Sequence, residues 1–157
     1  MKSLFTEARF LLAPMLLLST GCVFFGPPHS EYRPIHQYAT DCNASNVIAD
    51  LATRPTDLNL KDDSGRTPLH IASANCCTGI VMILVQKHAK VDERGKAGET
   101  PLHVAAQEGC SNAVLLLLDH GAKINARDKQ SRTPLKRAIE YQQTGIADLL
   151  RIHGGVE

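Results

Sequence analysis

The chain has 157 residues, of which 43% are apolar and 21% are charged, and its formal net charge at pH 7 is +1. It holds four Phe, three Tyr and no Trp. The length is that of one modest soluble domain, and the basic residues are scattered rather than gathered in a stripe. The composition therefore argues against a nucleic-acid-binding protein and against binding to an anionic lipid surface.

The chain opens with the layout of an export signal. MKSLFTEAR is weakly positive, and the apolar run FLLAPMLLLST follows it. The apolar core of this run has about 10 residues, whereas a helix that spans a bilayer needs roughly 20. We therefore expect residues 1–21 to be a signal peptide. The alternative is an uncleaved membrane anchor that continues through Phe25.

The residues around Cys22 indicate how the exported chain would be held. LLLSTGC resembles the lipobox of bacterial lipoproteins, with Ser19 where that family usually has Leu. The resemblance implies cleavage before Cys22 and acylation of Cys22, and two or more acyl chains anchor a protein stably. Because Val23 is not the Asp that retains many such proteins on the inner membrane, the resemblance favours the outer membrane, facing the periplasm. The proline-rich segment 22–34 is expected to be a flexible tether.

A tetrapeptide returns at a fixed interval in the rest of the chain. TPLH stands at 67–70 and again at 100–103, and TPLK stands at 133–136, so the three copies are evenly spaced. The same 33-residue shift brings apolar residues into common columns: Leu84 with Leu117 and Leu150 and, shifted backwards, Ala39, Val47 and Leu51 with their later counterparts. A fixed period of this length is typical of stacked repeats. The sequence therefore predicts three clear units and a degenerate first unit that begins near Ile35.

Each unit has the pattern of a helical hairpin. Thr-Pro suits the start of a helix, because the Thr hydroxyl can cap it and Pro needs no N–H at the first helical position. A short helix with apolar residues on one face follows, then a polar break such as QEGCSN, then a more apolar helix such as IVMILV. A turn residue such as Gly121 ends the second helix, and a polar turn such as AKINARDKQS leads to the next unit.

These motifs resemble the ankyrin repeat, whose signature is G-x-T-P-L-H-x-A. GRTPLHIA begins at Gly65 and GETPLHVA at Gly98, while the last copy reads SRTPLKRA and the first reads RPIHQYA. The resemblance implies an all-α ankyrin repeat solenoid of about four helix-turn-helix units with short β-turn or hairpin tips. The expected ankyrin repeat domain is 35–157, with units at 35–63, 64–96, 97–129 and 130–157.

The resemblance also implies a structural role for the motif residues, in which the histidine ring ties neighbouring turns together through hydrogen bonds. These residues are Thr67, Pro68, His70, Thr100, Pro101, His103, Thr133 and Pro134. One helical pair cannot bury its apolar face alone, so the units must stack and the ends of the stack must be polar. Asp50, which the 33-residue shift aligns with Ile83, and Arg151, aligned with Val85, fit outward-facing caps.

Four cysteines fall in the break between the two helices of a unit: Cys42, Cys76, Cys77 and Cys110. By the 33-residue shift, Asn43, Cys76, Gly109 and Gln142 share one column. The ankyrin family usually fills this column with Gly, because the backbone there has positive φ. Cys normally adopts such a backbone only at a cost, so Cys76 needs a compensating interaction.

In an oxidising compartment these cysteines could link adjacent units through disulfides. Helical layers lie about 8–10 Å apart, whereas a disulfide needs Cα atoms ~4.4–6.8 Å apart. Equivalent positions in neighbouring units, such as Cys77 and Cys110, would therefore need local backbone displacement, and positions offset by one, such as Cys42 and Cys76, are expected to fit better. Two connectivities remain open: Cys42–Cys76 with Cys77–Cys110, and Cys42–Cys77 with Cys76–Cys110. The alternative is four reduced cysteines packed into the loops.

The sequence carries no recognisable catalytic or metal-binding motif. It has no paired carboxylates, G-x-S-x-G, phosphate loop, H-E-x-x-H or C-x-x-C. We therefore expect no enzymatic activity, no metal site and no cofactor. The one alternative activity for which the sequence offers candidate residues is a thiol-redox reaction of Cys76 and Cys77.

The ankyrin resemblance implies a concave face of turn tips and first helices that binds another protein. The family's variable positions give candidate partner-binding residues in three units: Asp63, Ser64, Arg66, Ala74 and Asn75; Lys96, Ala97, Glu99, Gln107 and Glu108; Lys129, Gln130, Arg132, Glu140 and Tyr141. This face is mixed in charge and nearly lacks aromatic residues, which usually anchor tight interfaces, so modest affinity is expected.

The sequence thus predicts a monomeric, non-enzymatic protein–protein interaction module that is lipid-anchored at the bacterial cell envelope. Its partner would be an unidentified protein and not a nucleic acid. Two alternatives remain. One is a structural envelope protein that needs no partner face, and the other is an intracellular ankyrin adaptor without a lipid anchor.

Overall fold

The computed structural model describes residues 34–157. The signal peptide expected at 1–21 and the acylation site expected at Cys22 lie outside the described residues. So does the tether expected at 22–34, except for Pro34.

All regular elements within residues 34–157 are helical, as the sequence predicts for an ankyrin solenoid. Eight α-helices form four hairpins, which we call units 1 to 4, and one 3-10 helix follows unit 1. In chain order the elements are α1 (Pro34–Thr40), α2 (Ala44–Thr53), η1 (Pro55–Asn59), α3 (Pro68–Ala74), α4 (Thr78–Gln86), α5 (Pro101–Glu108), α6 (Ser111–Asp119), α7 (Pro134–Glu140) and α8 (Thr144–Ile152).

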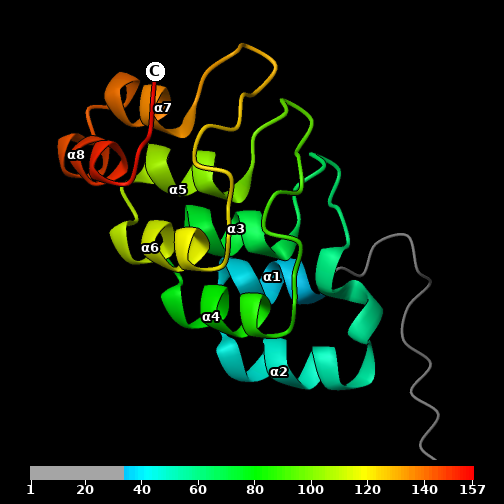
Figure 1. Cartoon of the computed structure of the whole chain (residues 1–157). Coiled ribbons are helices and arrows are strands. Elements are labelled where there is room, and N and C mark those ends of the chain that lie inside the picture. Colours follow the sequence, from blue (N-terminus) through cyan, green and yellow to red (C-terminus); the bar gives the residue numbers. More distant parts are fainter. Residues whose placement is uncertain (1–33) are drawn as a thin grey trace, which may run out of the picture. The chain divides into compact units, whose positions relative to one another are not determined.

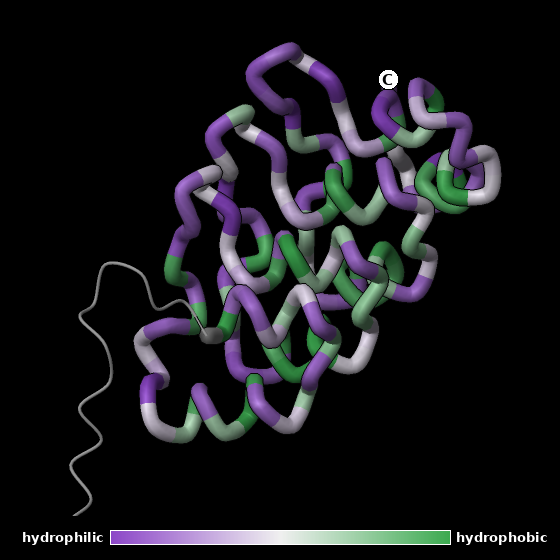
Figure 2. The backbone as a smooth tube through the Cα atoms, turned by 180° about the vertical axis from the view of Figure 1, so that it is seen from behind, coloured by the Kyte–Doolittle hydropathy of each residue, from purple (hydrophilic) through white to green (hydrophobic). Residues whose placement is uncertain are grey.

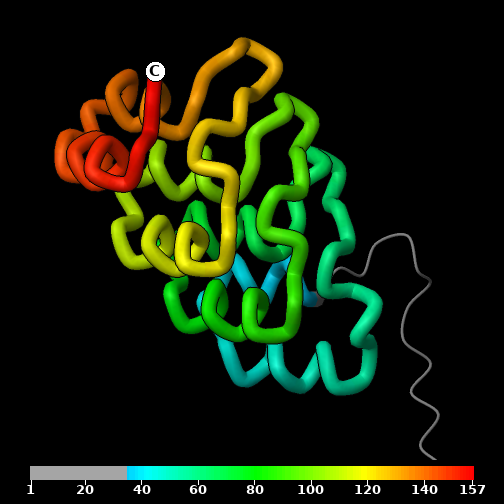
Figure 3. Tube along the Cα trace, in the orientation of Figure 1, coloured from blue at the N-terminus to red at the C-terminus, as the bar shows by residue number. Residues whose placement is uncertain are grey.

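The helices form two layers. Figure 1 shows the first helices α1, α3, α5 and α7 stacked in one layer and the second helices α2, α4, α6 and α8 in the other. Each helix contacts the equivalent helix of the next unit, as α3 contacts α5 and α4 contacts α6. The long connections between units project from one side of the stack (Figure 3). We call their outer turns the tips.

The core lies between the two layers and runs through all four units. Leu84 and Leu117 of the second helices and Leu69 and Leu102 of the first helices are completely buried. Figure 2 shows hydrophobic segments along the helices and hydrophilic segments along the connections. Because each apolar face is covered by the neighbouring unit, no unit has a complete core of its own.

The spacing between units 1 and 2 differs from the predicted repeat interval. Pro34 and Pro68 both open a first helix, and they are one residue further apart than Pro68 and Pro101. The extra residue lies in the second half of unit 1, where α2 has 10 residues while α4, α6 and α8 have 9 each. Every residue of α1, and of α2 as far as Leu51, therefore aligns with the residue 34 positions later in unit 2, and not with the one 33 positions later.

This shift moves Ala39, Val47 and Leu51 into the columns of Ser73, Val81 and Val85, and it corrects two further column assignments made from the sequence. The positive-φ column holds Cys42 (52°), Cys76 (54°), Gly109 (79°) and Gln142 (60°), and not Asn43. Asn43 instead caps α2, where its side chain accepts a hydrogen bond from the Asn46 amide.

The second correction concerns the first cap residue. Asp50 stands in the column of Leu84 and not in that of Ile83, so it is partly buried and does not face outward. Its Oδ2 atom has no hydrogen-bond partner among the described residues, and burial raises the pKa of the carboxyl group. At the other end, Arg151 is exposed and pairs with Asp148 (2.9 Å), which fits a polar cap.

Replacement of Leu117 tests whether the units share one core. Leu117→Ala removes a completely buried side chain, and we expect the free energy of unfolding to fall by about 2–5 kcal/mol. All helices should unfold in a single transition, because each unit is covered only by its neighbours. Urea unfolding followed by circular dichroism measures both quantities. The matched control is Leu115→Ala on the same helix, where the side chain is 37% exposed and the loss should stay below about 1 kcal/mol. Equal losses for the two variants would contradict this account of the core.

Candidate interaction face

A histidine ring joins each of the first three units to the next tip. His36 Nε2 lies 3.1 Å from the Arg66 carbonyl oxygen, His70 Nε2 lies 3.1 Å from that of Glu99, and His103 Nε2 lies 3.0 Å from that of Arg132. The three contacts are equivalent and form a ladder along the stack. The structural role that the ankyrin resemblance implied for His70 and His103 is the one that the geometry provides.

The hydrogen bonds of the ring define its protonation state. The Thr67 amide donates to His70 Nδ1 (3.1 Å), and the Thr100 amide donates to His103 Nδ1 (3.2 Å). An amide N–H can only donate, so Nδ1 carries no proton and Nε2–H donates to the carbonyl of the next unit. Burial lowers the pKa of both rings, and the carbonyl bonds offset this only in part. Both rings are therefore neutral at pH 7.

Unit 4 ends this ladder in a different way. Lys136 stands where the other units have histidine, and its Nζ atom lies 3.6 Å from Glu157 Oε2. The Thr133 hydroxyl instead donates to the Val156 carbonyl oxygen (2.6 Å), so the C-terminal segment folds back onto α7.

A second ladder runs along the base of the tips and was not predicted from the sequence. Asn59 Oδ1 accepts from the Lys90 amide (2.8 Å), and Asp92 Oδ1 accepts from the Lys123 amide (3.0 Å). Asn125 Oδ1 continues the series by accepting from the Val156 amide (2.9 Å). The three acceptors recur at the same interval as TPLH, so the periodicity that reveals the tetrapeptide could also have found them.

The tips themselves are held together by backbone hydrogen bonds. The Lys96 amide donates to the Ser64 carbonyl oxygen, and the Lys129 amide donates to that of Ala97, both at 3.0 Å. This approach requires glycine beside it. Gly98 has a φ of 80°, and a Cβ atom there would lie 2.9 Å from the Lys129 nitrogen.

The candidate partner-binding residues lie on these tips and on the C-terminal halves of α3, α5 and α7, which together we call the interaction face. Most are exposed: Asp63, Ser64, Arg66, Asn75, Lys96, Ala97, Glu108, Lys129, Gln130, Glu140 and Tyr141. Ala74, Glu99, Gln107 and Arg132 are partly buried. The predicted set thus divides into exposed and partly buried positions, and the exposed side chains are the ones that a partner can reach directly.

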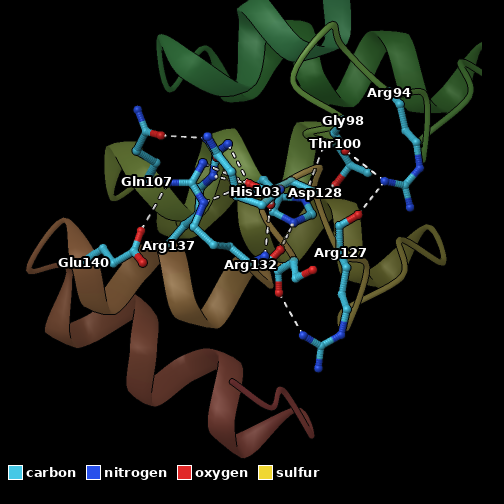
Figure 4. Close-up of polar contacts among 12 residues, drawn as sticks. Arg94, Gly98, Thr100, His103, Gln107, Arg127, Asp128, Arg132, Arg137 and Glu140 are labelled. Carbon is cyan, nitrogen blue, oxygen red and sulfur yellow. Dashed lines mark hydrogen bonds and ion pairs between the residues drawn. The ribbon is translucent and has the colours of Figure 1, made fainter.

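An ionic network fixes the interaction face at unit 4 (Figure 4). Asp128 has a completely buried side chain, and its Oδ2 atom accepts from Arg132 Nε (3.0 Å) and from Arg137 Nη2 (2.9 Å). Arg137 also donates to Gln107 of unit 3 (2.8 Å), and Arg132 pairs with Glu140 (3.3 Å). The residues of the interaction face and of its support therefore hold one another in place.

The charge state of Asp128 follows from these contacts. Burial alone would raise the pKa of this carboxyl group, but hydrogen bonds from the Arg132 amide and from the Arg137 and Arg132 guanidinium groups outweigh it and lower the pKa to about 2. No sequence pattern pointed to Arg137, because nine residues separate it from Asp128 and its column is apolar in unit 2, where Ile71 stands.

Unit 3 departs from this arrangement. Units 2 and 4 pair an aspartate with an arginine four residues later, as in Asp62 and Arg66 (3.0 Å), whereas unit 3 has Gly95 and Glu99 at these positions. The Glu99 carboxylate lies against Gly95, where a Cβ atom would overlap it. Its Oε2 atom is buried and has no hydrogen-bond partner among the described residues.

Disulfides join the breaks of the first three units. Cys42 is bonded to Cys77 and Cys76 to Cys110, with Cα atoms 5.4 and 5.1 Å apart. This is one of the two connectivities that the sequence left open. The expectation that Cys42 and Cys76 are offset by one was wrong, because both are positive-φ residues at equivalent positions. Each bond joins a positive-φ cysteine to the N-cap residue of the next second helix, which supplies the compensating interaction expected at Cys76.

Residues 34–157 contain neither a metal-binding cluster nor a helix of membrane-spanning character. No group of three or more His, Cys, Asp or Glu side chains in this range is arranged to hold a metal ion. In the same range, no helix is long and apolar enough to cross a bilayer.

A family model described as ankyrin repeats (3 copies) matches residues 35–128, which is more than half of the chain. The chain belongs to the ankyrin repeat family. An ankyrin repeat protein of fowlpox virus (strain NVSL) is 36% identical to this chain over 61 residues, which is 39% of the chain and 14% of the viral protein. The ankyrin chain thus spans only a small part of the length of that relative. Ankyrin repeats typically serve protein–protein interaction and not catalysis.

The buried rings of His70 and His103 make the ankyrin array sensitive to mild acid. Their folded-state pKa lies below the unfolded value of about 6.5, so their contribution to stability is complete above that pH and is lost as the pH falls toward the folded-state pKa. Each ring should add a slope of up to about 1.4 kcal/mol per pH unit below pH 6.5. Urea unfolding at pH 7, 6 and 5 measures the slope.

Substitution of the rings separates this effect from other titrations. His70→Asn with His103→Asn should lower stability at pH 7 but flatten the slope between pH 7 and 5. His70→Asn alone should flatten the slope by less than the double variant does. Carboxylates with lowered pKa, such as Asp62 and Asp128, act only at lower pH. An unchanged slope in the double variant would show that the rings are not buried as neutral donors.

Proposed function

We propose that this chain is a monomeric ankyrin module that binds a protein partner through the interaction face and is lipid-anchored at the bacterial cell envelope. The observation that carries the binding part of this proposal is the rigid display of exposed polar side chains on three adjacent tips. Ser64, Lys96 and Lys129 are exposed, while the backbone at each tip is hydrogen-bonded to a neighbouring tip.

This arrangement reduces the entropy that binding would lose. A loop that must be ordered on binding loses affinity, whereas a pre-ordered surface does not. Side chains add to the order of the tips, since Arg94 donates to the carbonyl oxygens of Gly98 and Arg127, and Lys61 donates to that of Arg94 (3.0 Å). The interaction face can therefore meet a partner as a preformed surface.

The exposed side chains suggest the chemistry of the partner. Lys96 and Lys129 occupy equivalent places on adjacent tips, and Tyr141 is half exposed at the end of α7. Tyrosine is a frequent anchor of protein interfaces, and charged residues at the rim mainly affect specificity and association rate. We infer a protein segment that covers Tyr141 and carries acidic groups opposite the two lysines, with modest affinity.

The envelope location rests on the N-terminal sequence and is supported by the disulfides. Disulfides persist in oxidising compartments such as the periplasm and are rare in the cytosol. Two of them tie the array together, which favours an exported protein over an intracellular adaptor. The lipobox-like sequence at Cys22 then accounts for attachment to the membrane.

A thiol-redox function has less support. Cys76 and Cys77 are bonded to cysteines of two different units, and Cys77 is buried. A redox centre that cycled through a Cys76–Cys77 bond would have to break both links between units. A structural envelope protein remains an outcome of the experiment below.

Photocrosslinking in intact cells tests the interaction face. A photoreactive amino acid in place of Lys96 should capture one defined protein, because this side chain is exposed on the middle tip of the three. Arg132 is unsuitable because it holds Asp128. The matched control is the same substitution at Asn112, which is exposed on α6 in the other layer. Identical products from the two positions, or no product from either, would reject a partner at this face and favour a structural role.

Lipid attachment is tested separately at Cys22. Cells fed an alkyne-bearing fatty acid should label the wild-type protein, and Cys22→Ala should lose the label together with membrane association. A wild-type protein that incorporates no label and fractionates with the soluble periplasm or cytosol would refute the anchor while leaving partner binding open.

A further inference from the structure

The two disulfides join equivalent pairs of positions in successive units. Each joins the positive-φ residue of one unit to the N-cap residue that begins the second helix of the next unit, first from Cys42 to Cys77 and then from Cys76 to Cys110. The two adjacent cysteines of unit 2 therefore point their bonds in opposite directions, Cys77 back to unit 1 and Cys76 forward to unit 3.

The stacking of the units brings these two positions close together, and the close approach does not depend on the presence of a disulfide. Gly109 and Gln143 occupy the same two positions between units 3 and 4, where there are no cysteines. A Cβ atom on Gly109 would lie 2.5 Å from Gln143 Oε1, so the two positions meet there as well. Stacking thus brings each positive-φ residue to the N-cap of the next unit at every interface.

The stacked array rejects the other connectivity. Cys42 and Cys76 are equivalent residues of neighbouring units, and so are Cys77 and Cys110. Equivalent positions lie about one helical layer apart, roughly 8–10 Å, which exceeds the ~4.4–6.8 Å between Cα atoms that a disulfide allows. The observed pairs meet this limit at 5.4 and 5.1 Å.

The unfolded chain has no such preference between a Cys42–Cys76 and a Cys42–Cys77 disulfide. Cys76 and Cys77 differ by only one residue in their separation from Cys42, and the entropy of closing a loop changes slowly with its length. An oxidant that acts before the units stack would therefore bond Cys42 to Cys76 about as often as to Cys77. Many such chains would then carry a bond that the folded array rejects.

We propose that the adjacent cysteines Cys76 and Cys77 form an exchange centre that corrects this error as the units stack. The Cys77 thiolate attacks the Cys42 sulfur of a Cys42–Cys76 disulfide. The Cys42–Cys77 bond forms, the Cys42–Cys76 bond breaks, and Cys76 leaves as a thiolate. One disulfide replaces another, so this step needs no oxidant or reductant.

The released Cys76 thiolate then completes the second link. Its bond to Cys110 forms by a thiol oxidation, in which a disulfide-bearing oxidant accepts two electrons and the two thiols lose their protons. Cys77 and Cys110 are buried in the finished array, so an external thiol meets them with difficulty. Maturation of this chain therefore depends on a thiol–disulfide oxidant of its compartment, but the choice of partner is made by the stack.

The test uses the full chain with Cys22→Ser and Cys110→Ser, which leaves Cys42, Cys76 and Cys77. The reduced chain is oxidised with oxidised glutathione in concentrated urea, freed of glutathione, and diluted into buffer. Iodoacetamide quenches samples over time, and tandem mass spectrometry that breaks the peptide bond between residues 76 and 77 identifies the alkylated cysteine. Far-UV circular dichroism follows folding in the same samples.

The expected result has two stages. In urea the ratio of Cys42–Cys77 to Cys42–Cys76 is roughly one. After dilution it rises by about tenfold or more, at a rate that is independent of protein concentration and increases with pH, since the thiolate is the attacking species. The chain with Cys22→Ser alone, which keeps Cys42, Cys76, Cys77 and Cys110, should reach the same Cys42–Cys77 bond. This second chain covers the case in which Cys110→Ser impairs folding.

The matched control is Cys77→Ser, in which a Cys42–Cys76 bond formed in urea should persist after dilution. Only Cys42 and Cys76 remain in this control, so the bond can be lost there only to an external thiol or to another molecule. Exchange through Cys77 is overturned if the Cys42–Cys76 bond is lost in the control as fast as in the parent chain. It is also overturned if the ratio stays near one in a chain that has folded, or if conversion proceeds only in proportion to added glutathione. Neither the partner of the interaction face nor the lipid anchor enters this test.

Discussion

A neutral histidine that spans two units is the contact on which the rest of the array depends. Its Nδ1 atom accepts from the amide that begins its own first helix, and its Nε2–H group donates to a carbonyl of the following tip. One ring thus fixes both the start of a helix and the position of the next tip. The apolar helices supply most of the stacking free energy but are non-directional, so it is this polar contact that sets where each tip comes to lie.

The two sides of the array are fixed by different chemistry. Histidine and Asn or Asp side chains tie the tips together on one side, and disulfides tie the breaks together on the other. The disulfides end at unit 3, and at the next interface the buried Asp128–Arg137 pair and its bond to Gln107 link units 3 and 4. A face built on such a frame changes little when a partner binds, which is the physical basis of the proposed function.

Much of this could be predicted from the sequence because repetition converts local signals into a global one. A single Thr-Pro is a weak helix start, but its return at a constant interval with apolar columns specified helices and units. The role of His70 and His103 was implied by the resemblance to the ankyrin repeat. The first unit was misaligned by one residue, because the constant 33-residue shift was applied to it although Pro34 and His36 precede Pro68 and His70 by 34 residues. That error placed Asn43 where Cys42 belongs and moved Asp50 to the wrong column.

Contacts that depend on three-dimensional placement were beyond a linear pattern. Arg137 reaches Asp128 only because α7 turns the side chain toward the preceding tip. The choice between the two cysteine connectivities likewise required the offset between units, which became known only when the positive-φ column was located. The interaction face was predicted as a set of positions, but its division into exposed and supporting residues came from burial.

The protonation state of the ring nitrogens of His70 and His103 tests the central contact most directly. Long-range ¹H–¹⁵N correlation spectra of the folded protein at pH 7 distinguish the two neutral forms of the ring from each other and from the charged form. Both residues are predicted to carry a proton on Nε2 and none on Nδ1, and the Nε2 proton should be protected from exchange with solvent. A proton on Nδ1, or a charged ring at this pH, would contradict the role assigned to these histidines.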